Sequence, residues 1–115
     1  MSDAQTSADS PAPSWHDVVA MAELDPDVPL GIDVAGTKVG LFQSGGSVFA
    51  LEDICPHAYA LLSQGCQEDG VIECPLHGAR FEAASGKCLN QIGQRDLKRY
   101  PLRVHGGRIS IQVGN

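Results

Sequence analysis

The chain has 115 residues, with 14 acidic and 8 basic side chains and a formal net charge of −6. This length provides one domain with a modest core and leaves no room for a separate catalytic domain. The negative charge argues against nucleic acid and against an anionic membrane surface as partners. No apolar run reaches the ~18 residues of a membrane span, and residues 1–5 lack the basic start of a signal peptide. A soluble, cytoplasmic protein is expected.

Thirteen glycines and seven prolines make the chain rich in turn-forming residues. No long stretch keeps the 3.6-residue apolar period of an amphipathic helix. The composition therefore predicts an all-β fold with many turns.

Residues 1–14 are small, polar and interrupted by proline, which predicts a disordered N-terminal tail. The folded domain is expected to begin at Trp15 and to continue to residue 115. Ser14-Trp15-His16-Asp17 has the spacing of a capping box, so local rules alone predict a helix from Val18.

Strands are predicted where apolar residues alternate with polar or small ones between turn signals. Leu30–Val34 is the first of these, and Thr37–Gln43 and Ser47–Leu51 form a hairpin around Gly45 and Gly46. Further strands are predicted over Val71–Glu73 and Arg80–Glu82, and a last hairpin over 97–104 and 108–113.

The charges are unevenly distributed along the chain. Residues before 80 hold twelve acids and one base, whereas residues 80–115 hold seven bases and two acids. We expect the two parts to interleave in one β-domain and to neutralise each other. The alternative is an acidic face on which a partner docks.

Two short boxes carry the chemistry. Cys55-Pro56-His57 and Cys74-Pro75-Leu76-His77-Gly78 are separated by 16 residues, and each combines one thiol with one imidazole. Four such ligands imply one metal site. A structural zinc site would also accept two Cys and two His, but it usually pairs like residues, as C-x2–4-C and H-x3–5-H.

A box with one Cys and one His suits a cluster of two metal ions that is bound between two loops. The Cys of each loop would bind one iron, and the His of each loop would bind the other. Two Cys on one iron and two His on the second is the ligation of a Rieske 2Fe-2S centre. A zinc knuckle remains the alternative.

The boxes C-P-H and C-P-L-H-G resemble those of Rieske ferredoxins, the small soluble carriers of bacterial aromatic-ring-hydroxylating dioxygenase systems. The resemblance covers about residues 15–113. It implies a Rieske fold, with an antiparallel β base domain and a small two-loop cluster-binding subdomain over about residues 53–92. It also implies a first strand over Trp15–Ala20 and a short turn over Met21–Leu24, in place of the helix that local rules predict.

The resemblance also implies the site and the function. Cys55 and Cys74 would bind the inner iron of one 2Fe-2S cluster, and His57 and His77 the outer iron. The protein would be a monomeric electron carrier and not an enzyme, taking single electrons from an NAD(P)H-dependent flavin reductase to a Rieske-type terminal oxygenase in aromatic compound catabolism. The alternatives are the small Rieske subunit of a nitrite-reductase-like enzyme and a zinc-stabilised interaction module.

Four positions depart from the high-potential Rieske proteins of respiratory complexes. Ala60 and Leu76 stand where those proteins have a disulfide, and Ala79 and Phe81 stand where they have hydroxyl donors to the cluster. The missing donors imply a reduction potential at the low end of the Rieske range, near about −150 mV.

The remaining chemistry-bearing residues have ordinary expected roles. Cys66 and Cys88 are expected to be buried thiols that form no disulfide. Gly78 leaves two alternatives open: its backbone amide is free to point at a bridging sulfide of the cluster, or it is an ordinary turn glycine. Partners are expected to dock at the cluster tip, over His57, His77 and an apolar rim that consists of Tyr59, Leu62, Pro75 and Leu76.

Overall fold

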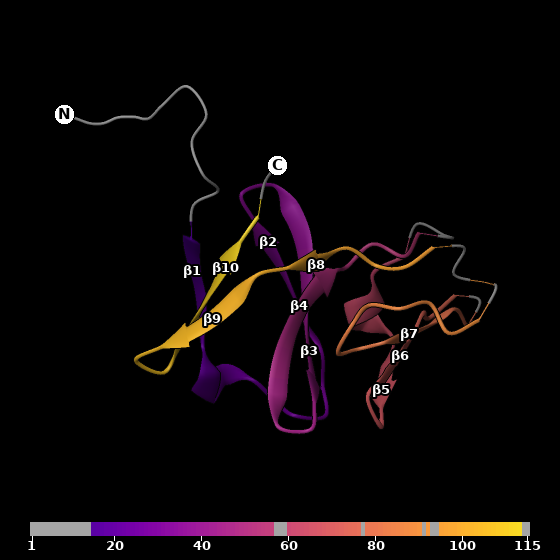
Figure 1. Ribbon diagram of the computed structural model, residues 1–115, viewed down its shortest axis with the longest axis horizontal. Helices are drawn as coiled ribbons and strands as arrows, with labels where there is room; N and C mark the ends of the chain where they lie inside the picture. Colours follow the sequence, from indigo (N-terminus) through magenta and orange to yellow (C-terminus); the bar gives the residue numbers. More distant parts are fainter. Residues whose placement is uncertain (1–14, 57–59, 77, 91, 93–94, 114–115) are drawn as a thin grey trace.

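The computed structural model describes residues 15–56, 60–76, 78–90, 92 and 95–113 (Figure 1). The predicted tail over residues 1–14 lies outside them, and the domain limits 15–115 and 53–92 stay predictions. The strands are β1 (Trp15–Ala20), β2 (Leu30–Val34), β3 (Thr37–Ser44), β4 (Ser47–Glu52), β5 (Cys66–Glu68), β6 (Val71–Glu73), β7 (Arg80–Glu82), β8 (Arg99–Tyr100), β9 (Leu102–His105) and β10 (Arg108–Gln112). Two 3-10 turns, η1 (Met21–Glu23) and η2 (Leu62–Gln64), complete the elements.

All strand pairs in the described part of the chain are antiparallel, which confirms the all-β prediction. Two sheets with the orders β1-β10-β9 and β2-β3-β4-β8 form the base, and β5-β6-β7 form a third sheet at one end of the molecule (Figure 1). No helix in the described ranges is long and apolar enough to cross a membrane.

The strands β3 and β4 separate two hydrophobic cores. Side chains alternate between the two faces of a strand, so Val39, Leu41 and Ala50 face the core between the two base sheets. Phe42 and Leu51 belong instead to the core of the third sheet, together with both box cysteines. The third sheet and the ligand loops therefore pack on the opposite face of the four-stranded sheet from the other base sheet.

The first element shows sheet pairing overriding a local signal. β1 pairs with β10 from Trp15 opposite Gln112 to Ala20 opposite Arg108, and Val19 is buried beside Ile109. The helix predicted by local rules is wrong here, because these contacts need an extended chain. The strand and the short turn implied by the resemblance are confirmed.

The C-terminal segment differs from the long strand predicted over 97–104. Pro101 has no backbone N–H to donate to a strand ladder, and the chain changes partner at this residue. Arg99–Tyr100 pair with β4, whereas Leu102–His105 pair with β10. The strand Cys66–Glu68 was not predicted, since Cys-Gln-Glu contains none of the β-branched or aromatic residues that are typical of strands.

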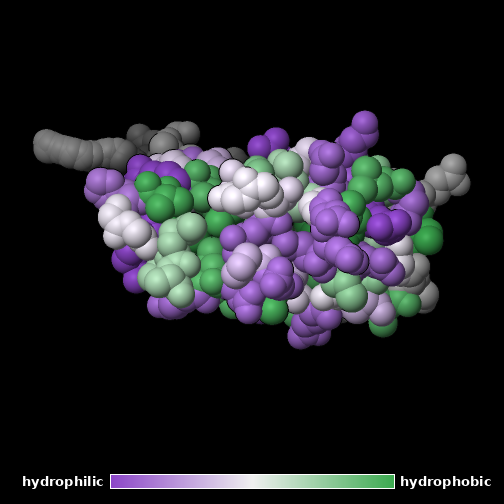
Figure 2. Space-filling model, turned by 90° about the horizontal axis from the view of Figure 1, so that it is seen from below, coloured by the Kyte–Doolittle hydropathy of each residue, from purple (hydrophilic) through white to green (hydrophobic). Residues whose placement is uncertain are grey.

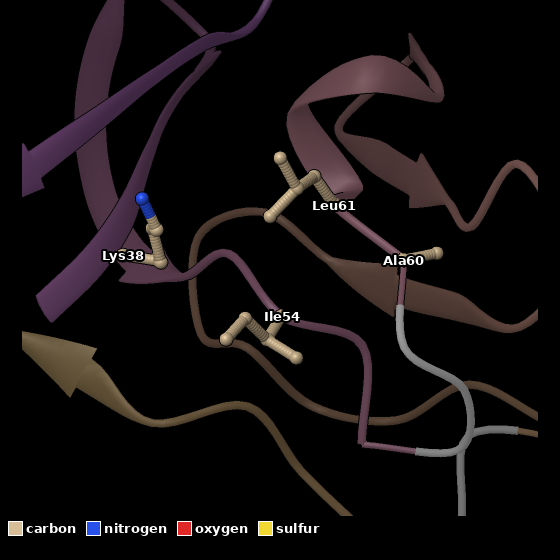
Figure 3. A pocket seen from close by; sticks show the side chains of 4 residues that line it. All are labelled: Lys38, Ile54, Ala60 and Leu61. Atoms are coloured by element: carbon tan, nitrogen blue, oxygen red, sulfur yellow. The ribbon is translucent and has the colours of Figure 1, made fainter.

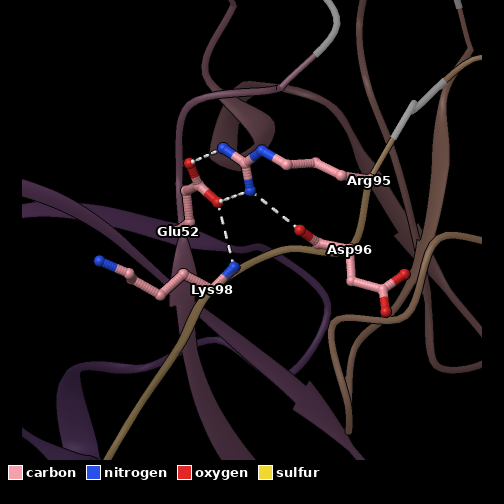
Figure 4. A network of polar contacts seen from close by, with 4 residues as sticks. All are labelled: Glu52, Arg95, Asp96 and Lys98. Carbon is pink, nitrogen blue, oxygen red and sulfur yellow. Dashed lines mark hydrogen bonds and ion pairs between the residues drawn. The ribbon is translucent and has the colours of Figure 1, made fainter.

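Two ion pairs join the acidic early part of the chain to the basic late part. Arg108 lies 2.6 Å from Asp17, joining β10 to β1. Arg95 holds both carboxylate oxygens of Glu52, at 2.9 and 2.7 Å, and also donates to the carbonyl of Asp96 (Figure 4). The expected interleaving is therefore confirmed at these two pairs.

The Glu52 pair fastens the return segment to the end of β4, three residues before Cys55. The backbone N–H of Lys98 also donates to Glu52, at 3.0 Å. Burial favours the neutral acid, but the hydrogen bonds from Arg95 and Lys98 outweigh it and lower the pKa of Glu52 below its ordinary 4.5. Because the pKa is lowered in the folded state, the stabilisation is complete above the ordinary pKa and is lost as the pH falls through the lowered one.

Replacing Arg95 by Met is expected to destabilise the protein measurably but modestly. The Arg95 side chain is half-exposed, so the loss should be about 1 kcal/mol or less. A loss of about 1 kcal/mol would lower the melting temperature by roughly 4–8 °C in a domain of this size. Circular dichroism melts at low salt and at about 1 M salt measure it, and the difference should shrink at high salt.

The control for this prediction is Lys87→Met, at an exposed lysine that makes no ion pair within the described residues. Equal melting temperatures for the Arg95→Met variant and the parent protein would show that the pair contributes nothing.

Candidate metal centre

The first ligand loop leaves the end of β4. Ile54 pairs with Leu61 in an isolated β-bridge, and the Cys55 N–H donates to the carbonyl of Ala60 at 2.9 Å. Residues 55–60 thus form a six-residue loop closed at its base. Cys55 is buried, at 3% exposure. His57 lies outside the described residues.

The second ligand loop connects β6 to β7. Glu73 pairs with Arg80, and the Cys74 N–H donates to the carbonyl of Ala79 at 2.8 Å. Residues 74–79 again form a six-residue loop that begins with a buried Cys and ends with Ala. In both loops, the cysteine N–H donates to the carbonyl of the alanine five residues later. His77 lies outside the described residues.

The two cysteines belong to one buried cluster of side chains. Cys55 and Cys74 share it with Leu62, Ile72 and Phe81. Thiolate is a soft ligand that suits iron–sulfur clusters, and burial shields it from water and oxidants. This donor pair fits the inner iron of a Rieske centre. The described residues contain no group of three metal-ligating side chains, and two of the four predicted ligands lie outside them.

Of the two alternatives for Gly78, the structure agrees with the ordinary turn glycine. Its φ is +77°, which glycine adopts readily, and its N–H donates to the Cys74 carbonyl at 3.3 Å. The prediction for Cys66 is wrong. Cys66 is exposed on β5 instead of buried. Cys88 is half-buried, and none of the four cysteines forms a disulfide, as predicted.

Asn90 supports the second loop, a role that the sequence did not reveal. Its side-chain amide donates to the Gly78 carbonyl at 3.1 Å, and its side-chain oxygen accepts from the Arg80 N–H at 3.2 Å. Its own carbonyl accepts from the Cys88 thiol at 2.6 Å. An asparagine between two loops is too common a pattern to mark such a role in advance.

The apolar rim differs in part from the prediction. Leu76 is 57% exposed and Pro75 is exposed, as expected, but Leu62 is fully buried because it begins η2 and packs against the core of the third sheet. Leu89 and Ile92 are exposed instead, at 47% and 41%. Figure 2 shows hydrophobic residues at the end of the molecule that the third sheet and the loops form. Tyr59 lies outside the described residues.

A hollow of about 230 Å³ lies beside the first loop (Figure 3). It is lined by Lys38 from β3 and by Ile54, Ala60 and Leu61 from the two flanks of the loop. Ala60 occupies one of the two positions where the respiratory Rieske proteins have a disulfide cysteine, and it packs against the core of the third sheet.

The geometry agrees with a family comparison. The Rieske [2Fe-2S] domain matches residues 14–101. The chain belongs to this family and carries one Rieske-type 2Fe-2S cluster, so iron and not zinc is the metal.

One relative and two solved structures refine the comparison. The chain is 34% identical to the ferredoxin component of the naphthalene 1,2-dioxygenase system of Pseudomonas aeruginosa, over 86% of this chain and 95% of the relative. A chain in the complex of reduced oxygenase and oxidized ferredoxin of carbazole 1,9a-dioxygenase is 27% identical, with a TM-score of 0.77, over 83% of this chain and 98% of that one. A putative NADH-dependent nitrite reductase small subunit from Mycobacterium tuberculosis is also 27% identical, with a TM-score of 0.77, over 90% and 97%.

These relatives bear on the class of function. A ferredoxin carries electrons and has no substrate of its own, so the prediction of an electron carrier that is not an enzyme is confirmed. The Rieske fold and the resemblance to dioxygenase ferredoxins are confirmed as well.

Proposed function

We propose that Cys55 and Cys74 hold the inner iron of the cluster and that His57 and His77 hold the outer iron. The observation that carries this assignment is that both boxes begin with a cysteine buried in the same core and held by the same backbone hydrogen bond to the alanine five residues later. The cluster supplies a one-electron redox centre. Neutral imidazoles in place of two thiolates make the added electron less costly, which raises the potential relative to an all-Cys ferredoxin.

The protein is then the ferredoxin component of a bacterial aromatic-ring dioxygenase system, taking single electrons from a flavin reductase to a Rieske-type terminal oxygenase. The 34% identity to a naphthalene dioxygenase ferredoxin over nearly the whole of both chains supports this function. The likeness to a chain of an oxygenase–ferredoxin complex supports the terminal oxygenase as a partner. The flavin reductase, the cytoplasmic location and the monomeric state are parts of the same proposal.

A second candidate is the small subunit of a nitrite reductase, favoured by the structural likeness to such a subunit. The two functions differ in how long the protein stays bound. A shuttle must leave each partner quickly, whereas a subunit stays in a permanent complex.

Transient electron transfer tests the proposal directly. The purified protein is reduced anaerobically by NADH through a dioxygenase-system reductase, and its reoxidation by a terminal oxygenase is followed in a stopped-flow spectrometer. Repeated turnover at substoichiometric ferredoxin supports a shuttle. Stable co-elution with a nitrite reductase large subunit, without transfer to any oxygenase, would support the second candidate.

The reduction potential is expected to rise in an Ala79→Ser variant. Ala79 is fully buried in the core that holds both cysteines, and its carbonyl accepts from the Cys74 N–H. A hydroxyl there would donate to the cluster or to a ligand sulfur and favour the more negative, reduced state. A hydrogen bond worth about 1 kcal/mol corresponds to about 40 mV, since a tenfold change equals about 59 mV for one electron.

A redox titration followed by EPR measures this shift. Ala83→Ser is the matched control, because Ala83 is equally buried in the same core but follows β7 instead of lying in a ligand loop. Equal potentials in all three proteins would mean that the missing hydroxyl does not set the potential.

A further inference from the structure

Among the described residues, Asp53 is the one buried charged side chain, at 2% exposure. It follows β4 and precedes Cys55 by two residues. Burying a carboxylate is costly unless hydrogen bonds compensate for the lost water. The hydrogen bonds of Asp53 therefore show which parts of the chain the buried carboxylate holds together.

Both carboxylate oxygens accept a hydrogen bond from Ser63. Oδ1 accepts from the Ser63 N–H and Oδ2 from its hydroxyl, each at 2.7 Å. The backbone of Asp53 is also engaged, since its N–H donates to the Lys38 carbonyl at 3.1 Å and its carbonyl accepts from the Leu62 N–H at 2.7 Å. Asp53 thus connects β3 to the start of η2, and its partners Leu62 and Ser63 lie on the far side of the first ligand loop.

The base sheet leaves room for this carboxylate. Gly31 and Gly40 lie directly opposite each other on β2 and β3. A Cβ added to Gly31 would lie 2.8 Å from Oδ2 of Asp53, and one added to Gly40 would lie 2.9 Å from Oδ1. The same Cβ atoms would lie still closer to the Ser63 hydroxyl oxygen at Gly31 and to the Phe42 ring at Gly40, so glycine at both positions keeps this crowded space open. The two glycines leave a space beside β2 and β3 that the side chains of Asp53 and Ser63 occupy.

The two ligand loops differ in how their bases are held. The second loop continues a regular ladder, in which Val71, Ile72 and Glu73 of β6 pair with residues of β7. The first loop has only the isolated bridge between Ile54 and Leu61. The Asp53–Ser63 hydrogen bonds lie just outside this bridge, on the side away from the loop. At the corresponding place beside the second loop, further residues of β6 pair with β7.

We propose that Asp53 is a positioning residue for the cluster, which fixes the base of the first loop, and with it the Cys55 ligand, against the base sheet. This inference rests on the proposed assignment of Cys55 as an iron ligand. Without the clamp, which consists of Asp53 and Ser63, the loop ends would separate more easily and the first loop would release its iron.

The test compares Asp53→Ala, Asp53→Asn and Ser63→Ala with the parent protein. Each variant is mixed with an iron chelator well below its melting temperature, and cluster loss is followed by visible absorbance. Asp53→Ala leaves both Ser63 donors unpaired, and we expect cluster loss about tenfold faster. Asp53→Asn keeps an acceptor for the Ser63 N–H and should fall between the parent and Asp53→Ala, as should Ser63→Ala.

Asp33→Ala is the matched control. Asp33 also accepts two hydrogen bonds, from the Gly36 N–H at 2.9 Å and from Lys38 at 3.1 Å, but it is exposed on β2 and both partners lie in the β2–β3 hairpin and not in a ligand loop. The EPR spectrum of the reduced cluster is the second readout. It should change in Asp53→Ala and stay unchanged in Asp33→Ala, whereas a role limited to overall stability would leave the spectrum unchanged in both.

The outcomes separate this inference from the proposed function. A parent protein without an iron–sulfur cluster would contradict the proposed function. A parent protein with its cluster, and clamp variants that lose it no faster than Asp33→Ala, would overturn the clamp alone. If Asp53→Ala does not fold, Asp53→Asn and Ser63→Ala decide the question by the same rates and spectra.

Discussion

A Cys74→Ser variant is expected to lose its cluster almost completely. Cys74 is 2% exposed, begins the second ligand loop and is a proposed ligand of the inner iron. Iron and labile sulfide should fall from about two each per chain to less than about a tenth of that, because a hydroxyl is a poor ligand for iron–sulfur clusters. Metal and sulfide analysis of the purified protein measures the loss.

The other cysteines supply the controls. Cys55→Ser should behave as Cys74→Ser does. Cys66→Ser changes an exposed thiol on β5, and Cys88→Ser changes a half-buried thiol that donates to Asn90, so both variants should keep their iron. Loss of the cluster in Cys66→Ser together with an intact cluster in Cys74→Ser would contradict the ligand assignment.

A Leu76→Glu variant is expected to slow electron delivery to the terminal oxygenase by about tenfold at low protein concentration. Leu76 is the most exposed large apolar residue of the ligand loops described here, at 57%, and it directly precedes the predicted ligand His77. Electron transfer weakens steeply with distance, so partners are expected to dock there. Burying a leucine in an interface contributes roughly 1.5 kcal/mol or more, and burying a glutamate is opposed by the cost of removing its charge from water.

Stopped-flow reoxidation of the reduced ferredoxin measures this effect. Val104→Glu is the matched control, since Val104 is 51% exposed but lies on β9 of the base. Leu76→Glu should keep the EPR spectrum and change the potential little, which separates docking from cluster damage. If Val104→Glu slows transfer and Leu76→Glu does not, partners dock on the base.

Most of the fold follows from local signals in the sequence. The Gly45-Gly46 turn sets the β3–β4 hairpin, both glycines having positive φ, and this hairpin delivers the first ligand loop. Local signals are misleading where long-range contacts decide the structure. The capping box at Ser14–Asp17 is overridden because β10 provides a partner for an extended chain.

The ligand boxes could be predicted because their chemistry is rare and their spacing specific. The contacts that hold the ligand loops in place could not be predicted from the sequence. The burial of Leu62 depends on η2 turning its side chain inward, and the Asp53–Ser63 contact joins residues ten positions apart in the space that Gly31 and Gly40 leave. Nothing in the sequence around Asp53 distinguishes it from any other acidic residue at the end of a strand.

The most direct test of the central claim is pulsed EPR of the reduced protein, together with metal analysis. Magnetic ¹⁴N nuclei bound to iron couple to the unpaired electron, so direct imidazole ligation is observable. The mixed ligation of a Rieske centre predicts about two irons and two sulfides per chain and couplings from two nitrogens, one of which disappears in His57→Ala or His77→Ala where the cluster survives. A cluster without directly bound nitrogen, or one zinc in place of two irons, would contradict the account.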